Sequence, residues 1–485
     1  MLSSIIFLPL AGVILCALLP KSAGALAKWV ALLVTGVDLV LAALMVAGFR
    51  PGGGLQFMER LDWVPQAGIQ YFVAVDGISM PLVALSALLT FLAVIASWKI
   101  DKKPSFYFAM LLLLQVGMNG VFAALDFVLF YVFWELVLVP MYFLIAQWGG
   151  PRREYAAVKF FLYTLLGSVF MLVGMVALYL QAGTFDLIEL AEIGKTLPAG
   201  FQWWLFLAFF LGFAVKVPVF PLHTWLPDAH VEAPTAASVL LAGILLKMGT
   251  YGFLRISLPV LPDAFAQWQV FLAVLAVISI LYGAATAFAQ TDVKKLVAYS
   301  SVSHMGFAML GIAAGTAAGL NGAMAVNISH GLTTGMLFLM VGMVYERAHT
   351  RQISELSGIS AAMPVIAGLM AFASFASLGL PGLSGFVGEF LSLMGAWQST
   401  AFAGWLVVVA SLGVLFGAAY MLWMLQRVVL GEPSEKVQGH PDASLREIVT
   451  VVPLIVLIAF IGVYWSALLQ YTDPVMQALS KVVGG

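Results

Sequence analysis

The sequence has only one cysteine, Cys16, among its 485 residues. A disulfide needs two thiols and an iron–sulfur cluster needs several thiolate ligands, so the chain can build neither from its own residues. It also lacks a Gly-x-Gly-x-x-Gly motif after a strand pattern, and Pro51-Gly-Gly-Gly54 predicts a loop. We therefore expect no cofactor in this chain, no metal site and no nucleotide chemistry.

Charged residues are also scarce. They make up 9% of the chain, whereas hydrophobic residues make up 62%. The mean hydropathy is +1.04. A chain of this composition cannot be dissolved in water, so it is predicted to lie in a lipid bilayer. The formal net charge of -1 gives no reason to expect a nucleic-acid partner.

Long apolar runs are what the sequence has in abundance. At roughly 20 residues per crossing they predict about fourteen transmembrane helices, hence an all-α polytopic membrane protein. The predicted spans are 2–20, 24–49, 75–98, 104–124, 127–148, 156–182, 203–220, 233–257, 267–290, 295–315, 321–346, 362–395, 401–430 and 448–471.

The basic residues other than Lys216 and Lys247 are divided unequally between the two sides. One side holds only Arg50, Arg60, Lys195, Arg255 and Lys481, and the other side holds the rest, beginning with Lys21. The positive-inside rule makes the richer side cytoplasmic, and an even number of helices then places both termini outside. We expect a multi-pass protein of the bacterial inner membrane, or of an equivalent energy-transducing membrane.

Several ionisable residues fall inside the predicted spans. Lys216 is a charged residue within the apolar run 201–221. The same is true of three further residues that lie within apolar predicted spans, Lys247, Glu135 and Glu389. A charge at the bilayer centre costs roughly 2.5–3.5 kcal/mol on insertion scales, so these residues are expected to be functional. With His304 and His330 they form a set of protonatable groups at membrane depth, which predicts a proton pathway.

Structural explanations exist for several polar residues. A lone intramembrane histidine can simply hydrogen-bond a neighbouring helix. The roles of Asp38, His223, Asp228 and His230 are left open by the sequence. Asp76 begins the third helix and is predicted to be its N-cap.

Two predicted helices, the seventh and the twelfth, are interrupted beside a charge. The seventh breaks at Lys216-Val-Pro-Val-Phe-Pro221, and the twelfth breaks at 378–385, just before Glu389. Broken helices at corresponding positions indicate an inverted repeat with ion sites at the repeat interface. We predict N-terminal helices in 1–103, two inverted five-helix repeats in 104–257 and 258–430, and a C-terminal helix in 431–485.

Four stretches of the sequence resemble the antiporter-like membrane subunits of respiratory complex I. They are 133–141 (FWELVLVPM), 220–252 (FPLHTWLPDAHVEAPTAASVLLAGILLKMGTYG), 292–306 (DVKKLVAYSSVSHMG) and 386–390 (FVGEF). The resemblance spans most of the chain and implies fourteen helices, an inverted repeat and proton pumping driven by quinone reduction in other subunits.

By this resemblance, Glu135 and Lys216 are the family's ion pair and Lys247 its central lysine. His304 and His330 are its connecting relay, and Glu389 is its outlet carboxylate. NAD, FMN, iron–sulfur clusters and quinone would lie in partner subunits, and L-type and N-type antiporter-like chains would be neighbours in the bilayer.

The outlet residue also favours one branch of the family. The L-type and N-type chains, and related sodium/proton antiporter subunits, typically have a lysine where this sequence has Glu389. The sequence also stops shortly after its fourteenth helix, without the long lateral helix of an L-type chain. Both features favour the M type.

The residues suggest how such a subunit would move a proton. Glu135 stabilises the charged form of Lys216 when the two are close, and separating them removes that support. Lys216 would then release a proton to Lys247. From there the proton would pass through His304 and His330 and leave by Glu389.

Three other classes of protein compete with this interpretation. An Mrp-type sodium/proton antiporter subunit would use similar carboxylates and lysines, but a lysine in place of Glu389 would be typical of it. A membrane haem protein would use His304 and His330 as axial ligands. A non-catalytic scaffold is the third alternative, and it gains nothing from buried lysines.

Overall fold

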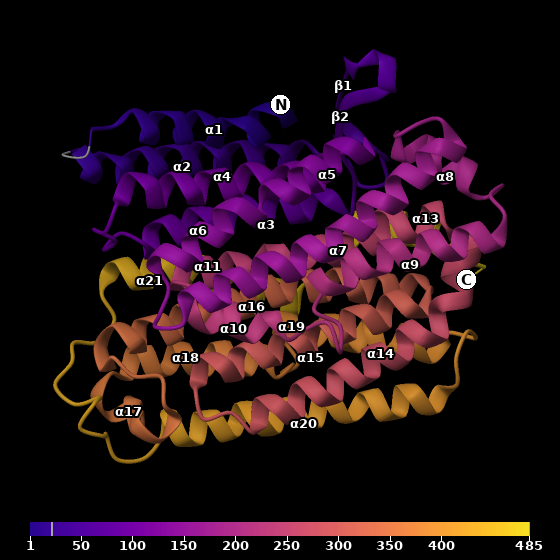
Figure 1. The fold of residues 1–485 in the computed structure, drawn as a ribbon. Coiled ribbons are helices and arrows are strands. Elements are labelled where there is room, and N and C mark those ends of the chain that lie inside the picture. Colours follow the sequence, from indigo (N-terminus) through magenta and orange to yellow (C-terminus); the bar gives the residue numbers. More distant parts are fainter. Residues whose placement is uncertain (21–22, 485) are drawn as a thin grey trace.

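The computed structural model describes residues 1–20 and 23–484. Within this part of the chain, twelve helices are long and apolar enough to cross a membrane, and α1 and α18 are shorter apolar helices. This confirms the prediction of about fourteen membrane helices. They lie roughly parallel and run across the view of Figure 1, with α17 (Ile359–Ala362) near one end and α8 (Leu187–Gly194) near the other.

The first half of the bundle contains α1 (Leu2–Leu18), α2 (Gly24–Gly48), α3 (Ser79–Ala96), α4 (Pro104–Ala123), α5 (Phe127–Leu136), α6 (Leu138–Trp148), α7 (Arg153–Ala182), α9 (Ala199–Lys216) and α10 (Trp225–Glu232). A continuous helical run follows, made of α11 (Thr235–Leu240), η3 (Leu241–Leu245), α12 (Leu246–Gly252), η4 (Phe253–Ser257) and α13 (Leu258–Val260).

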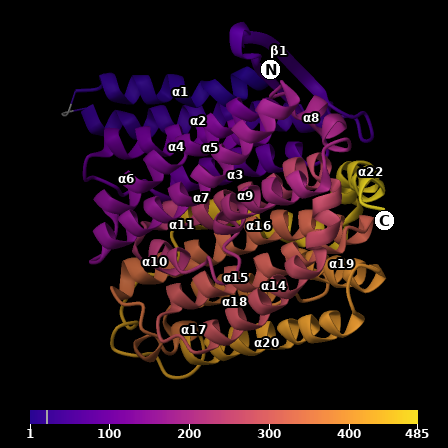
Figure 2. The same cartoon turned by 45° about the vertical axis from the view of Figure 1, so that its right-hand side comes forward.

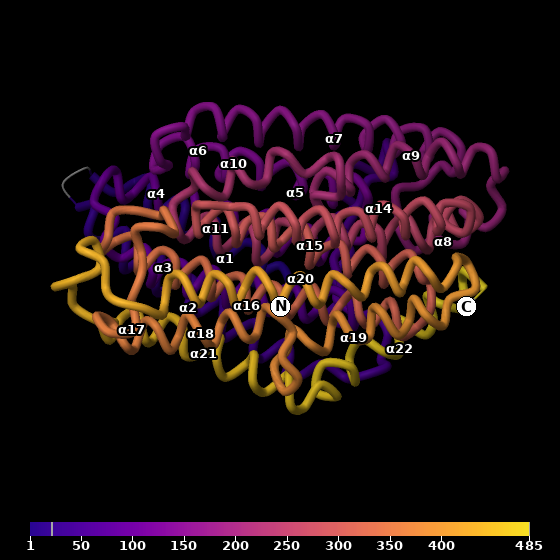
Figure 3. The backbone as a smooth tube through the Cα atoms, turned by 90° about the horizontal axis from the view of Figure 1, so that it is seen from below, coloured from indigo at the N-terminus to yellow at the C-terminus, as the bar shows by residue number. Residues whose placement is uncertain are grey.

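The second half contains α14 (Pro262–Phe288), α15 (Val293–Ala314), α16 (Ala317–Ala348), α18 (Pro364–Ser377), α19 (Ser384–Gln398), α20 (Gly404–Val428), α21 (Leu445–Val463) and α22 (Ser466–Val482). Helices α20 and α14 run side by side along the lower margin of the bundle in Figure 1, so they lie in front when the molecule is seen from below (Figure 3). Helices α15, α16 and the run from Thr235 to Val260 are almost wholly buried, so the polar residues that they carry lie away from lipid.

The two interrupted helices are confirmed. Helix α9 ends at Lys216, and the chain resumes as the short helix α10 after a non-helical segment. In the same way α18 ends at Ser377 and α19 begins at Ser384. The proline-containing stretch 217–224 and the glycine-rich stretch 378–383 break the backbone ladder beside Lys216 and near Glu389.

The helix that carries Lys247 is distorted on both sides of it. The segments η3 and η4 are π-helical turns, so the backbone is wider there than in a regular α-helix. At Gly243 in η3 an added Cβ would lie 2.3 Å from a Leu89 atom and 3.7 Å from the Gly331 carbonyl oxygen of α16. The absence of a side chain at Gly243 thus lets this helix lie close to α3. At Gly331 of α16 an added Cβ would lie 3.0 Å from the Gly243 carbonyl oxygen, so the glycine at 331 lets α16 lie close to the same helix.

Two elements go beyond the predicted all-α pattern. Strands β1 (Gln56–Val64) and β2 (Ile69–Val75) form an antiparallel hairpin in the segment that the hydropathy assigned to a loop. The predicted last helix, 448–471, is two helices, because the chain turns between Val463 and Ser466 and continues as α22 (Figure 2). A 20-residue hydropathy window detects neither a short hairpin nor an amphipathic helix.

The ion pairs agree with the predicted separation of basic residues into two sides. At one end of the bundle they join Lys28 to Asp101, Lys99 to Glu346, Arg152 to Asp228 and Arg347 to Glu447. At the other end they join Arg60 to Asp186 and Arg255 to Asp76. Among residues 1–20 and 23–484, no ion pair joins a member of one group to the other. Lys21, assigned to the first group, lies outside the described residues.

Candidate functional site

The carboxylate of Glu389 lies beside His304. Its Oε1 is 2.8 Å from Nδ1 of His304, and both side chains are buried. Helix α19 supplies the carboxylate and α15 supplies the imidazole. On the far side of the ring, His304 Nε2 is 3.2 Å from the Ser377 hydroxyl at the end of α18 and 3.4 Å from the Tyr420 hydroxyl on α20.

The two intramembrane histidines are neighbours. The ring centroids of His304 and His330 are 5.7 Å apart, with 59° between the ring planes. A cavity of about 10 Å³ lies between them, and it is also lined by Ser329, Thr333 and Glu389. This volume is near the minimum for one water molecule, and the lining is polar. One water there would lie between His330, whose Nε2 has no partner among the described residues, and the group formed by His304 and Glu389.

His330 in turn contacts the central lysine. Its Nδ1 is 2.6 Å from Nζ of Lys247, which also donates a hydrogen bond to the Ala242 carbonyl oxygen. That carbonyl lies in the π-helical turn η3, where the ladder of backbone hydrogen bonds is altered. Lys247 is completely buried and makes no ion pair among the described residues. Lys247, His330, His304 and Glu389 therefore form a contiguous polar chain inside the bundle.

Glu135 and Lys216 do not form the direct ion pair that was expected. Neither Lys216 Nζ nor Glu135 Oε1 has a hydrogen-bond partner in the part of the chain that the structure describes. The ammonium lies 5.1 Å from the ring centroid of Trp134, the residue before Glu135. The two charges are thus held near each other but apart, with an aromatic face beside the cation.

Lys216 and Lys247 lie on neighbouring helices. A Cβ placed on Gly249 would lie 2.7 Å from the Phe213 carbonyl oxygen, so α12 packs against the last turn of α9. Lys216 ends α9 and Lys247 lies two residues before Gly249. The six expected residues thus fall into a four-residue chain and a Glu135–Lys216 group that adjoins it through this helix contact.

The structure also places the residues whose roles the sequence left open. Asp228 pairs with Arg152 and Lys159 at 2.8 and 2.7 Å at one end of the bundle, so its role there is explained by ion pairing. His223 and His230 are buried, and both nitrogens of each ring lack a hydrogen-bond partner among the described residues. His230 stacks on Phe338 with 4.7 Å between ring centroids.

Asp76 is not the N-cap of α3, as was predicted, because Ile78 holds that position and Asp76 lies two residues earlier. Its carboxylate still accepts hydrogen bonds from the backbone N–H groups of Ile78 and Ser79. It also pairs with Arg255. Burial raises the pKa of the Asp76 carboxyl, but the nearby Arg255 and the backbone donors outweigh it and hold that pKa below its ordinary value.

Sequence reasoning missed Ser377 and Tyr420. Ser377 lies at the end of α18, where the glycine-rich break begins, and a polar residue at a predicted break is a usable signal. Tyr420 lies in an apolar stretch of α20 and gives no comparable signal, because only the packing of α20 brings its hydroxyl to His304.

The site does not suit a haem. The cavity of about 10 Å³ between His304 and His330 has no room for a porphyrin, and Nδ1 of each ring is already within hydrogen-bond distance of Glu389 or Lys247. In the described part of the chain, no group of three His, Cys, Asp or Glu residues is placed to hold a metal ion.

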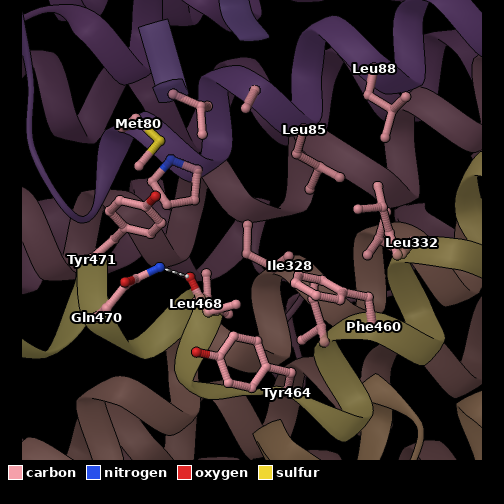
Figure 4. A pocket seen from close by; sticks show the side chains of 16 residues that line it. Met80, Leu85, Leu88, Ile328, Leu332, Phe460, Tyr464, Leu468, Gln470 and Tyr471 are labelled. Atoms are coloured by element: carbon pink, nitrogen blue, oxygen red, sulfur yellow. Dashed lines mark hydrogen bonds between the residues drawn. The ribbon is translucent and has the colours of Figure 1, made fainter. Parts of the chain in front are cut away.

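A second cavity, of about 430 Å³, lies apart from the polar chain. Figure 4 shows its apolar lining between α3, α16, α21 and α22, with Leu85, Ile328 and Phe460 among the side chains that face it. Its lining has no charged residue, so this cavity does not extend the polar chain.

The fold and the site together define a class: a multi-pass membrane protein with two broken helices and a buried Lys–His–His–Glu chain. Residues 124–417 match the family described as "NADH:quinone oxidoreductase/Mrp antiporter, TM". Residues 4–119 match "NADH-ubiquinone oxidoreductase chain 4, amino terminus". The chain belongs to this family of NADH:quinone oxidoreductase and Mrp antiporter membrane subunits.

Individual relatives support the same family assignment. The chain is 45% identical to NADH-quinone oxidoreductase subunit M of Rhodobacter capsulatus, over 98% of this chain and 95% of the relative. It is 43% identical to NAD(P)H-quinone oxidoreductase chain 4 1 of Synechococcus elongatus, over 99% and 92%.

Solved structures show the same fold. A chain of respiratory complex I from Thermus thermophilus with bound NADH superposes with a TM-score of 0.91 at 34% identity, covering 100% of both chains. A chain of the Mrp complex from Dietzia sp. DQ12-45-1b superposes with a TM-score of 0.86 at 24% identity, over 99% of this chain and 52% of that one, which shows a shared fold.

Proposed function

We propose that this chain is the M-type proton-translocating membrane subunit of an NADH:quinone oxidoreductase. Its observational basis is the buried chain Lys247–His330–His304–Glu389, in which neighbouring groups contact each other directly or across a one-water cavity. Groups that alternately bind and release a proton at such distances are what a proton path needs. Relatives with 45% and 43% identity carry the names of subunits of quinone oxidoreductases, which supports this assignment.

Electron transfer would occur in other subunits. NAD, FMN, iron–sulfur clusters and quinone would be bound there, and the single cysteine of this chain excludes an iron–sulfur cluster held by its own thiolates. Neighbours in the membrane would include L-type and N-type antiporter-like chains. This chain would contribute the proton path, and its partner subunits would drive the change that opens and closes it.

The gate would be the Glu135–Lys216 group. When a partner subunit moves a charge so that Glu135 approaches Lys216, the ammonium is stabilised, and when they separate that support is lost. The structure has no direct pair between them, with Lys216 over Trp134, and in this proposal such a separation would favour release of the proton. Lys216 would then pass its proton toward Lys247, His330, His304 and the outlet Glu389.

The division of the chain into inverted repeats, 104–257 and 258–430, belongs to the same proposal. Two pairs of contacts support it. Asp126 caps α5 and bridges to Asp186 after α7, and Asp292 caps α15 and bridges to Gln352 after α16. Asp186 binds Arg60 while Asp292 binds Arg351, which belong to opposite charge groups, as inversion requires.

The positive-inside rule supports an orientation with Arg152 and Arg347 in the cytoplasm and both termini outside, in an inner membrane. Glu389 would then discharge its proton to the outer phase.

Co-purification and reconstitution together test the proposal. A tagged copy of the chain should isolate with flavin and iron–sulfur subunits that oxidise NADH, and vesicles containing the complex should acidify during turnover. Lys247→Ala should abolish this acidification, whereas Lys195→Ala, at an exposed residue, should not change it. Isolation with subunits that carry no NADH-oxidising activity would refute the assignment.

A further inference from the structure

Asp38 is a buried acid that takes no part in the chain described above. It lies near the middle of α2 and is completely buried, on the inner face formed with Ala31, Thr35 and Ala42. The opposite face of α2, with Leu33 and Val40, is exposed where lipid would lie. An ionised carboxylate in this position needs a positive charge or a full set of donors.

No cation is available to it from the surrounding helices. The three helices that pack most closely on α2 are α1, α3 and α4, and none of them contains a Lys, Arg, His, Asp or Glu. Their titratable side chains are Cys16 on α1 and Tyr107 on α4. On α2 itself, Lys28 pairs with Asp101 at 2.8 Å and is ten positions from Asp38, about 15 Å along the helix.

Two amide side chains of α4 donate hydrogen bonds to Asp38. Gln115 Nε2 and Asn119 Nδ2 donate to Asp38 Oδ2, at 2.6 and 3.3 Å. Asn119 Nδ2 also donates, at 3.0 Å, to the carbonyl oxygen of Ile5. That carbonyl is free because the residue four positions later, Pro9, has no N–H. The cluster therefore ties α1, α2 and α4 together.

Three buried oxygens of this cluster have no donor in the described part of the chain. They are Asp38 Oδ1, Gln115 Oε1 and Asn119 Oδ1. Each amide oxygen shares a carbon atom with the nitrogen that is bound to Asp38, so all three oxygens lie around the same carboxyl group. Leaving one buried acceptor unsatisfied is unfavourable, and here three are gathered at a group that would also carry a negative charge.

We propose that Asp38, Gln115 and Asn119 form a second proton-binding site, separate from the Lys–His–His–Glu chain, in which Asp38 is a protonated carboxyl at neutral pH. The added proton turns Oδ1 into a donor to Gln115 Oε1 or Asn119 Oδ1. One proton thereby neutralises the carboxylate of Asp38 and gives hydrogen-bond partners to two of the three buried oxygens that lack a donor.

A metal cation fits the cluster less well than a proton does. Asp38 Oδ2 already accepts from two N–H groups, whose hydrogens occupy the side from which a cation would approach. Only three oxygens remain free, whereas hard cations take about six or more oxygen ligands. The ligand class of this site is therefore the proton, and its role is to hold α1, α2 and α4 in register.

The test uses the assembled, purified complex and compares Asp38→Asn with Asp38→Ala. Asparagine is neutral and offers N–H donors where the protonated acid offers O–H. It should keep assembly, proton pumping and a thermal midpoint within about 2 °C of the unsubstituted complex. Alanine leaves both amides without their partner and should lower the midpoint by about 4 °C or more.

Infrared difference spectra of the same samples report protonation directly. At neutral pH, Asp38→Asn should remove one carbonyl-stretch band of a protonated carboxyl. Thr35→Val should leave that band in place, because Thr35 bonds only the backbone of its own helix. An unchanged carboxyl spectrum in Asp38→Asn, or a failure of this variant to assemble, would overturn the proposal. Stabilisation by sodium that is lost in Asp38→Asn would overturn it in favour of a cation site.

Discussion

At the scale of single residues, the chemistry of the proposed path depends on groups that can lose or gain a proton while remaining buried. Glu389 and His304 face each other at 2.8 Å, and the ring of His304 has Ser377 and Tyr420 hydroxyls on its other side. This arrangement holds the imidazole beside the carboxylate, so in the proposed path a proton that arrives from His330 would be directed to Glu389. The proposed outlet would therefore require an ionisable group at position 389.

Substitutions of Glu389 separate proton transfer from packing. Glu389→Gln keeps the size and hydrogen bonding of the side chain but cannot ionise, so we expect proton release to fall about tenfold or more, equal to about 1.4 kcal/mol. Glu389→Asp should retain part of the activity. Glu389→Lys should retain some pumping with an altered pH dependence, because an amine can still relay a proton. Proton uptake into vesicles measures all three.

The opposite pattern would assign Glu389 a structural role. If glutamine were tolerated and lysine prevented assembly, the carboxyl would be a hydrogen-bonding residue of the broken helix, and the outlet would have to lie elsewhere.

The gate is tested at Lys216 and Glu135. Lys216→Ala or Glu135→Ala should leave the complex assembled, because the two side chains form no direct ion pair in the structure. Either change should abolish pumping and slow NADH oxidation severely, because the proposed gate needs both charges. The proton-to-electron ratio in reconstituted vesicles is the measurement. Glu192→Ala, at an exposed surface pair, is the control. A near-normal ratio in fully assembled Lys216→Ala would show that the group is not obligatory.

At the scale of helices and strands, function depends on where regular structure stops. Helix α9 ends at Lys216, and the turn η3 gives Lys247 the Ala242 carbonyl as a partner. Such interruptions free backbone groups that must be satisfied inside the protein, so they occur where helices surround a polar path and not where they face lipid.

The ion pair of Asp76 and Arg255 joins the start of α3 to the end of the helix that carries Lys247. Asp76→Asn should preserve the hydrogen bonds from the backbone N–H groups of Ile78 and Ser79 but leave Arg255 buried without a counter-ion, and we expect a loss of about 3 kcal/mol in stability. Asp62→Asn, at an exposed residue of β1, should change nothing.

The difference in stability between the unsubstituted protein and Asp76→Asn depends on pH through the lowered pKa of Asp76. A carboxyl whose pKa is lower in the folded state stabilises above its unfolded value of about 3.9, and the benefit is lost as pH falls through the folded value. The wild-type advantage should therefore stay constant from about pH 5 to pH 8 in thermal unfolding of the purified complex. An advantage that changed across this window would contradict the charged pair.

At the scale of the whole molecule, sidedness is the property that turns a chain of protonatable groups into a pump. Basic residues gather at one end of the bundle, and the hairpin, α8 and the end of α22 lie toward the other (Figure 1). A proton path has a direction only if its two mouths face different aqueous phases.

Thiol labelling tests the orientation. In a Cys16→Ala background, Lys103→Cys and Lys195→Cys are both exposed positions. An impermeant reagent should label position 195 from the outer side of intact cells and position 103 only after the membrane is opened, because the positive-inside rule places Lys103 in the cytoplasm. Labelling of both positions from one face would refute the arrangement of about fourteen helices.

The sequence by itself determined the membrane class, the approximate spans, the two broken helices and the six ionisable residues. It did so because an apolar run of bilayer length, a proline or glycine break and a buried charge are each visible within a short stretch of chain. The value of Lys216 or Glu389 as a signal comes from the cost of placing such a group in lipid, and that cost does not depend on its neighbours.

Only the tertiary structure decided which of those residues touch. Lys247 meets His330 where Gly331 lets α16 lie close to the helix that carries Lys247, and Tyr420 reaches His304 from a helix more than 100 positions away. The same packing holds Lys216 over Trp134, apart from Glu135, and encloses Asp38 with two amides of α4. These relations depend on distances between helices remote in sequence, which are set by side-chain packing and leave no local pattern in the chain.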